Sequence, residues 1–183
     1  QAGDALAVLA TQKVLPYEGA VDGRRLYREA HLRLAIAVAA KDPTAARTHA
    51  QQALEWPEHL GAGKPYEEDI DRRLDDWIAS RIDARPGTGA ASAAATASRD
   101  RILGATHGPS GTGGLVTALA LTEAGRADDA TRAVDAWAAT VTQPDVIAWG
   151  RSLIAGPLAA FPLRPANAGD YGILDALNRA TPR

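Results

Sequence analysis

The sequence contains neither cysteine nor methionine, and each absence limits what the chain can be. Without cysteine it can form no disulfide, no thiol nucleophile and no cysteine-ligated zinc site. The compartment stays open, because a cysteine-free chain suits reducing and oxidising surroundings alike. Without methionine, Gln1 is not a translation start, and we expect the chain to be a mature product or a piece of a longer protein.

Aromatic residues, long apolar runs and an excess of one charge are also missing. Aromatics make up 5% of the 183 residues although 46% are hydrophobic, and alanine, the best helix former, supplies the difference. No apolar run approaches the roughly 20 residues of a membrane span. Lys and Arg number 20 against 22 Asp and Glu, a net charge of −2. We therefore expect one all-α domain whose partners include neither membrane nor nucleic acid.

Apolar periodicity and helix-breaking residues divide the chain into helix, turn and helix, repeatedly. The expected helices cover residues 2–15, 24–40, 44–56, 66–82, an alanine-rich stretch ending at 103, 115–125, 127–141 and 144–156. Residues 156–172 are rich in proline and glycine, so we expect them to be mostly irregular, followed by a short helix over 173–180.

The fourth expected helix begins in an acidic run. Glu67, Glu68 and Asp69 suit the positive end of a helix dipole, and Glu68 with Arg72 and Asp69 with Arg73 stand in the favourable i,i+4 order. We interpret this run as a solvated helix start rather than as paired catalytic carboxylates, which need a cleft and a separation of about 5–10 Å.

Two stretches share a helical frame. "KDPTAARTHAQQALEWP" and "GRADDATRAVDAWAATV" each place a small residue, Ala46 or Ala130, soon after a turn, with apolar residues four and seven positions later. The first stretch resembles the second helix of a tetratricopeptide repeat. The frames lie 130 − 46 = 84 residues apart, which is not a multiple of the roughly 34-residue period, and the first-helix Trp-Leu-Gly-Tyr pattern is absent. The resemblance implies a tetratricopeptide-like α-α superhelix, a short solenoid of antiparallel helix pairs.

A second resemblance concerns the phrases "YEGAVDGRRLYREAHLRLA", "ALEWPEHLGAGKPY" and "RLDDW". They are similar to the helical C-terminal part of large bacterial proteins of an uncharacterised family, whose N-terminal part is β-rich and mutarotase-like. The similarity extends to about residue 165, so we expect a tetratricopeptide-like repeat domain over 1–165 and an irregular tail with a short terminal helix over 166–183. The resemblance implies a bacterial protein, and the cytoplasm is favoured over secretion.

The "GAGKP" stretch (61–65) looks like a phosphate-binding loop but lacks its parts. That motif needs a glycine where Glu58 stands and a serine or threonine where Pro65 stands, and it follows a strand rather than a helix. We interpret the stretch as a corner between two helices, with glycines for unusual φ angles.

The other possible sites are weaker. "HGPSGTGG" (107–114) offers several backbone N–H groups before a helix but has no nucleophile elbow, so we expect a mobile loop. None of the histidines has a partner at metal-ligand spacing, and His31 and His49 are interpreted as packing or surface residues. The four tryptophans are expected to fill the core, with sugar stacking as an alternative for Trp56.

One edge is our candidate for specific contact. A shift of 40 residues aligns the corner "YEGAVDGRR" with the "WPEHLGAGK" corner, pairing Glu18 with Glu58 and Arg24 with Lys64. The candidate binding residues are Glu18, Arg24, Trp56, Glu58, His59 and Lys64.

The sequence favours a non-catalytic helical-repeat module that binds another protein or another domain of the same polypeptide. The alternative is an accessory domain of a larger carbohydrate-active enzyme, with carbohydrate as a ligand. An all-α enzyme is a third, weaker hypothesis, because we find no catalytic residues. No cofactor and no metal are expected.

Overall fold

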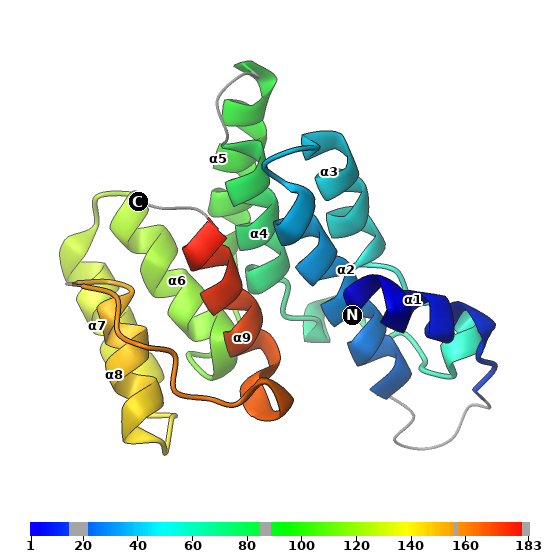
Figure 1. The fold of residues 1–183 in the computed structure, drawn as a ribbon. Helices are drawn as coiled ribbons and strands as arrows, with labels where there is room; N and C mark the ends of the chain where they lie inside the picture. Colours follow the sequence, from blue (N-terminus) through cyan, green and yellow to red (C-terminus); the bar gives the residue numbers. More distant parts are fainter. Residues whose placement is uncertain (15–21, 85–88, 156, 181–183) are drawn as a thin grey trace. The chain divides into compact units, whose positions relative to one another are not determined.

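The computed structural model describes residues 1–14, 22–84, 89–155 and 157–180, and within these the regular structure is entirely helical (Figure 1). The α-helices are α1 (Ala2–Thr11), α2 (Asp22–Val38), α3 (Pro43–Gln52), α4 (Arg73–Asp83), α5 (Gly89–Gly104), α6 (Gly111–Glu123), α7 (Ala127–Ala138), α8 (Pro144–Ser152) and α9 (Pro165–Ala180). Two single 3-10 turns, η1 (Glu58–Leu60) and η2 (Glu67–Asp69), lie between α3 and α4. The predicted all-α class is confirmed. Among the described helices, none is both long and apolar enough to cross a bilayer.

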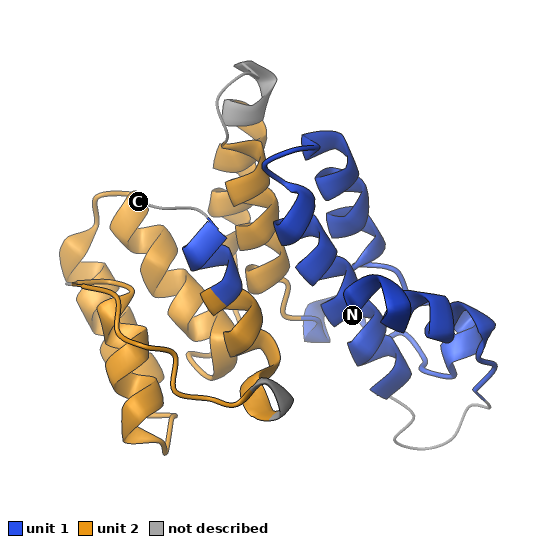
Figure 2. Ribbon diagram, viewed as in Figure 1, with its two compact units in different colours: residues 1–70, 176–183 blue, residues 71–175 orange. Residues whose placement is uncertain are grey.

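The chain forms two compact units, coloured separately in Figure 2. Unit 1 consists of residues 1–70 and 176–183, and unit 2 of residues 71–175. Neither unit ends at residue 165, the boundary that the resemblance implies between repeat domain and tail.

In unit 1, helix α2 packs against both α1 and α3. Alanine makes the α2–α3 hairpin close, since Ala35, Ala46 and Ala53 are fully buried and a methyl side chain lets helix backbones approach. The turn between the helices is fixed by Asp42, whose carboxylate accepts a hydrogen bond from the Ala45 N–H at 2.9 Å. Pro43 follows as the first helical residue, where its missing N–H costs nothing.

In unit 2, the helices pair as α4 with α5 and α6 with α7. Three of the four tryptophans, Trp77, Trp137 and Trp149, are buried here, which confirms their predicted role in the core. The Tyr171 ring stands edge-on to Trp137 and Trp149, and the Tyr171 hydroxyl accepts a hydrogen bond from Trp137 Nε1 at 3.1 Å. A few large rings thus supply the bulk that the alanine-rich helices lack.

The start predicted for the fourth helix is wrong. Residues Glu67–Asp69 form only the η2 turn, Ile70 is extended, and α4 begins at Arg73. The acidic run is therefore not the first turn of a helix, so the helical i,i+4 spacing on which the expected pairs rest is absent from Glu68 and Asp69 to the start of α4. The helix begins later because the Asp71 carboxylate accepts a hydrogen bond from the Arg73 N–H at 3.1 Å, a local bond that competes with helix upstream.

Two segments predicted to be irregular are partly helical. Helix α9 starts at Pro165 rather than at residue 173, with a break at Gly169, whose φ is 46°. Proline is favoured in the first turn of a helix, so its presence does not exclude one. The "HGPSGTGG" stretch is helical from Gly111 onward, and only its first four residues belong to a loop.

The Gly150 backbone of α8 lies against the Trp137 ring. A Cβ at Gly150 would lie 2.2 Å from Trp137 Cη2, and the ring is fully buried. We therefore expect Gly150→Ala to lower the free energy of unfolding by roughly 1–3 kcal/mol, measured by urea denaturation. Gly104→Ala is the matched control, because no atom lies within 4 Å of its Cβ. Equal stability of the two variants would contradict this packing.

Candidate functional site

Residues 53–72 connect α3 to α4, and we call residues 53–70, the part that belongs to unit 1, the corner. It turns at η1, where Leu60 is 1% exposed, and then at Gly61, whose φ of 73° is left-handed. Such a φ favours glycine, so the prediction that a corner glycine adopts an unusual φ is confirmed at Gly61.

Arg24, in the first turn of α2, fixes the corner from inside. Its side chain is buried, its Nη2 donates a hydrogen bond to the Ala53 carbonyl at 2.8 Å, and its guanidinium lies 4.5 Å from the centre of the Trp56 ring. A Cβ on the preceding Gly23 would already be within 3.5 Å of Leu60. The first turn of α2 therefore packs directly beneath the corner.

A second contact fixes the corner from the N-terminal side. The Val14 N–H donates a hydrogen bond to the His59 carbonyl at 2.8 Å. The segment after α1 thus lies beside η1, although forty-five residues separate the two along the chain (59 − 14 = 45).

The predicted binding residues fall into three groups. Glu18 lies outside the described residues. Arg24 is buried and Trp56 half-buried, and they contact each other inside the corner. The remaining three, Glu58, His59 and Lys64, are exposed. Arg24 and Lys64 were aligned as equivalent basic residues, but one is buried and the other forms an exposed ion pair with Glu67.

The exposed side of the corner carries an aromatic residue among acidic ones. Tyr66 is 78% exposed, the largest exposure among the large hydrophobic residues of the described chain. The segment contains five acidic residues against one lysine, a net charge of 1 − 5 = −4: Glu55, Glu58, Glu67, Glu68 and Asp69 against Lys64. The corner segment is therefore much more acidic than the chain as a whole.

A polar cluster on the α2–α3 hairpin was missed by sequence reasoning. His31 Nδ1 lies 3.0 Å from His49 Nδ1, the Tyr27 ring stands edge-on to His31, and the Tyr27 hydroxyl donates to a Glu55 carboxylate oxygen at 3.1 Å. Burial, with the hydrogen bond to Glu55 and its charge, raises the pKa of Tyr27 to about 12. Burial and the nearby His49 lower the pKa of His31.

The hairpin turn was the signal that could have found this pair. His31 and His49 each lie nine residues from Ala40 at the turn (40 − 31 = 49 − 40 = 9). Positions equidistant from the turn of an antiparallel helix pair lie opposite each other, whereas spacing along one helix reveals nothing about them.

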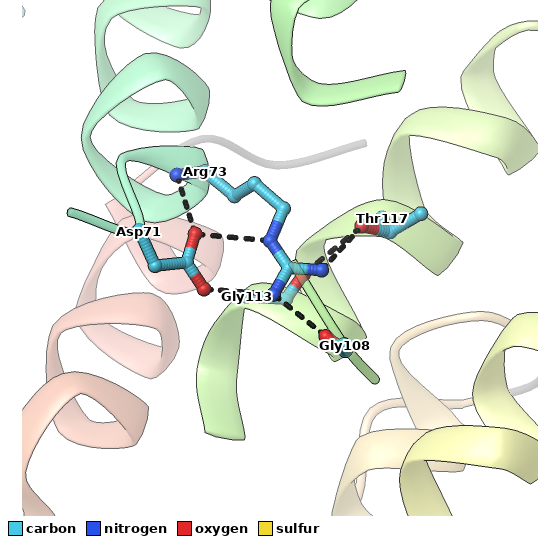
Figure 3. Close-up of polar contacts among 5 residues, drawn as sticks. All are labelled: Asp71, Arg73, Gly108, Gly113 and Thr117. Atoms are coloured by element: carbon cyan, nitrogen blue, oxygen red, sulfur yellow. Dashed lines mark hydrogen bonds and ion pairs between the residues drawn. The ribbon is translucent and has the colours of Figure 1, made fainter. Parts of the chain in front are cut away.

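Unit 2 contains a buried arginine with a similar role (Figure 3). The Arg73 side chain is 5% exposed. Its Nε and Nη2 donate hydrogen bonds to the two carboxylate oxygens of Asp71, at 3.0 and 2.7 Å. It also donates to the Gly108 carbonyl at 2.9 Å and to the Thr117 hydroxyl at 3.1 Å. A Cβ at Gly113 would lie 2.3 Å from the Asp71 carboxylate, so a glycine is needed there. The loop before α6 is thereby tied to the start of α4.

These hydrogen bonds favour the ionised form of the Asp71 carboxyl group. Burial alone would raise the pKa of Asp71, but the hydrogen bonds from Arg73, with the charges of Arg73 and His107, outweigh it and hold the pKa below its usual range. Since the folded pKa is the lower one, this stabilisation is present above the ordinary pKa and is lost as the pH falls through the folded value. The arrangement is a structural clasp, because the guanidinium of Arg73 is bonded to a carboxylate, a carbonyl and a hydroxyl of the protein itself.

Comparisons of the sequence with protein-family models and with curated proteins, and of the structure with solved structures, find no match. Within the described residues, no group of three or more His, Cys, Asp or Glu side chains is placed to hold a metal ion.

Arg24 should be essential for the corner. We expect Arg24→Ala to lower the free energy of unfolding by roughly 2–4 kcal/mol, since a buried carbonyl loses its donor and Trp56 loses its cation. Arg25→Ala is the control, because Arg25 is 58% exposed in its ion pair with Asp22; it should cost less than about 1 kcal/mol. Thermal or urea unfolding measures both, and similar losses in the two variants would disprove the structural role of Arg24.

Proposed function

We propose that the chain is a non-catalytic helical-repeat module that binds another protein, or another domain of the same polypeptide, through the exposed side of the corner. The observation that carries the proposal is Tyr66, 78% exposed on a segment that buried contacts hold in one conformation. Tyrosine is enriched at the centres of protein interfaces, and loops on a rigid scaffold commonly carry binding residues.

The charge of the corner indicates the kind of partner. Five acidic residues surround Tyr66 in the sequence, so the complementary surface is a basic one with an apolar pocket for the tyrosine ring. Electrostatic attraction of this kind speeds association and weakens as salt is added. Nucleic acid does not fit, since its phosphates would be repelled.

The finer fold forms part of the same proposal. Adjacent helices pair as α2 with α3, α4 with α5 and α6 with α7, which is the unit from which a tetratricopeptide-like stack is built. We propose that the pairs belong to such a repeat. In that class of protein, binding to peptides or domains is the usual role of the exposed surfaces.

A carbohydrate is the second candidate ligand, in keeping with an accessory domain of a larger carbohydrate-active enzyme. What favours it is again Tyr66, an exposed aromatic residue that Glu67 and Glu68 follow directly in the sequence. Trp56, the sequence's alternative for sugar stacking, has Arg24 over its ring and is better suited to packing.

Photo-crosslinking at Tyr66 tests the choice of partner. With p-benzoylphenylalanine in place of Tyr66, irradiation of the producing cells should give a discrete cross-linked protein. When a cell lysate is irradiated instead, the yield of this cross-linked protein should fall as the salt concentration is raised. The same photo-residue in place of Leu158, 45% exposed in unit 2, is the matched control. No adduct at Tyr66, or the same adducts at both positions, would contradict a specific protein interface there.

Calorimetry separates the carbohydrate alternative from the protein interface. Titration of the isolated chain with oligosaccharides should give no heat if the corner is only a protein interface. Heat that disappears in Tyr66→Ala, with helical content retained, would instead support the accessory-domain function.

A further inference from the structure

His31 on α2 and His49 on α3 face each other directly across the hairpin. Their Nδ1 atoms are 3.0 Å apart and their ring centres 5.2 Å apart. The difference, 5.2 − 3.0 = 2.2 Å, is close to two imidazole ring radii, so the two nitrogens point at each other rather than at a shared third point. The geometry is that of one N–H···N hydrogen bond, and not of two ligands around a cation.

Such a bond tolerates one extra proton but not two. A neutral histidine carries its proton on one nitrogen only, so one Nδ1 donates here and the other accepts. If one ring becomes charged, its Nδ1–H still donates to the neutral partner. If both rings are charged, both Nδ1 atoms carry protons, the bond is lost and two positive charges face each other.

The surroundings oppose the second proton. Burial and the charge of His49 act most strongly on His31, the charge of Arg24 acts in the same direction, and Glu55 opposes them; together they lower the pKa of His31. Tyr27 contacts His31 through its ring. Because the pKa of Tyr27 is raised to about 12, its hydroxyl stays protonated at neutral and acidic pH. Helix α1, which also packs on α2, has Asp4 as its one titratable side chain, and this carboxylate pairs with the terminal amine.

The pair is also linked to the corner. Tyr27 touches the His31 ring on one side and holds Glu55, three residues beyond the end of α3, on the other. The contacts therefore run without a break from His49 through His31 and Tyr27 to the first residues of the corner.

We propose that the His31–His49 pair is a pH-sensitive latch that closes the α2–α3 hairpin at neutral pH and releases α3 and the start of the corner in mildly acidic conditions. The direction follows from linkage. Because the folded pKa of His31 is below its ordinary value of 6.5, the unfolded chain binds more protons between the two values. The latch therefore contributes fully above about pH 6.5 and loses its contribution as the pH falls toward the folded value.

Hydrogen exchange of the whole chain at pH 7.5 and 5.5 tests the latch. After correction for intrinsic rates, we expect the protection of α3 amides to fall relative to that of α7, because the hydrogen bond between the two histidines is lost when both rings carry a proton. Helix α7 is the internal reference because it contains no histidine. Unchanged protection of α3 relative to α7 would overturn the proposal.

Two variants identify the group that is responsible. In His49→Asn the side-chain amide supplies a hydrogen-bond donor and an acceptor near the position of Nδ1, and neither of them titrates. The fall in the protection of α3 amides between pH 7.5 and 5.5, relative to α7, should therefore disappear. His59→Asn, which changes an exposed histidine of η1, should keep it; retention in His49→Asn would overturn the proposal. If His49→Asn fails to fold, NMR titration of the wild-type rings decides, since two independent single-step titrations would contradict a shared bond.

Discussion

A buried guanidinium in the first turn of a helix is the constraint on which the connecting segments of both units depend. Arg24 opens α2 and Arg73 opens α4, and the exposed fractions of their side chains are 7% and 5%. An arginine cannot give up its charge, so its donors must find acceptors once they leave water. In both units the acceptors include a carbonyl of an irregular segment, that of Ala53 for Arg24 and that of Gly108 for Arg73. A segment that satisfies a buried charge is no longer free to take other conformations.

This constraint explains how an alanine-rich chain can present a defined surface. Alanine helices pack closely but provide few side chains that reach beyond their own pair. The corner provides such side chains, and Arg24, Trp56 and Leu60 hold it from within. Its exposed residues include Tyr66 and the five acidic side chains, and a segment held in this way would lose little entropy if it bound a partner. The histidine pair lies between α2 and α3, and α3 leads into the corner. The proposed latch would therefore act on the base of this surface.

Sequence reasoning predicted what local patterns control. Alanine content indicated the all-α class, and the break between the helices expected over 24–40 and 44–56 indicated the α2–α3 hairpin. The small number of aromatic residues indicated the burial of Trp77, Trp137 and Trp149. It was wrong about the start of α4, where a single Asp71 bond outweighs helix propensity, and about Pro165, which permits a helix rather than excluding one.

The remaining errors concern contacts that no local pattern contains. Arg24 was assigned to an exposed edge because its partner Ala53 is 29 residues away. His31 and His49 were considered singly because only the folded hairpin brings them together. Whether the predicted edge residues Glu58, His59 and Lys64 bind a ligand stays a prediction, although the side chains of all three are exposed.

The most direct test of the role of Arg24 is the backbone mobility of the corner, measured by 15N relaxation in the wild-type chain and in Arg24→Ala. We expect order parameters of about 0.85 for residues 57–70 in the wild type, as in rigid backbone, and below about 0.6 in the variant. A corner that is already flexible in the wild type, or that stays rigid without Arg24, would contradict the claim that a buried arginine builds this surface.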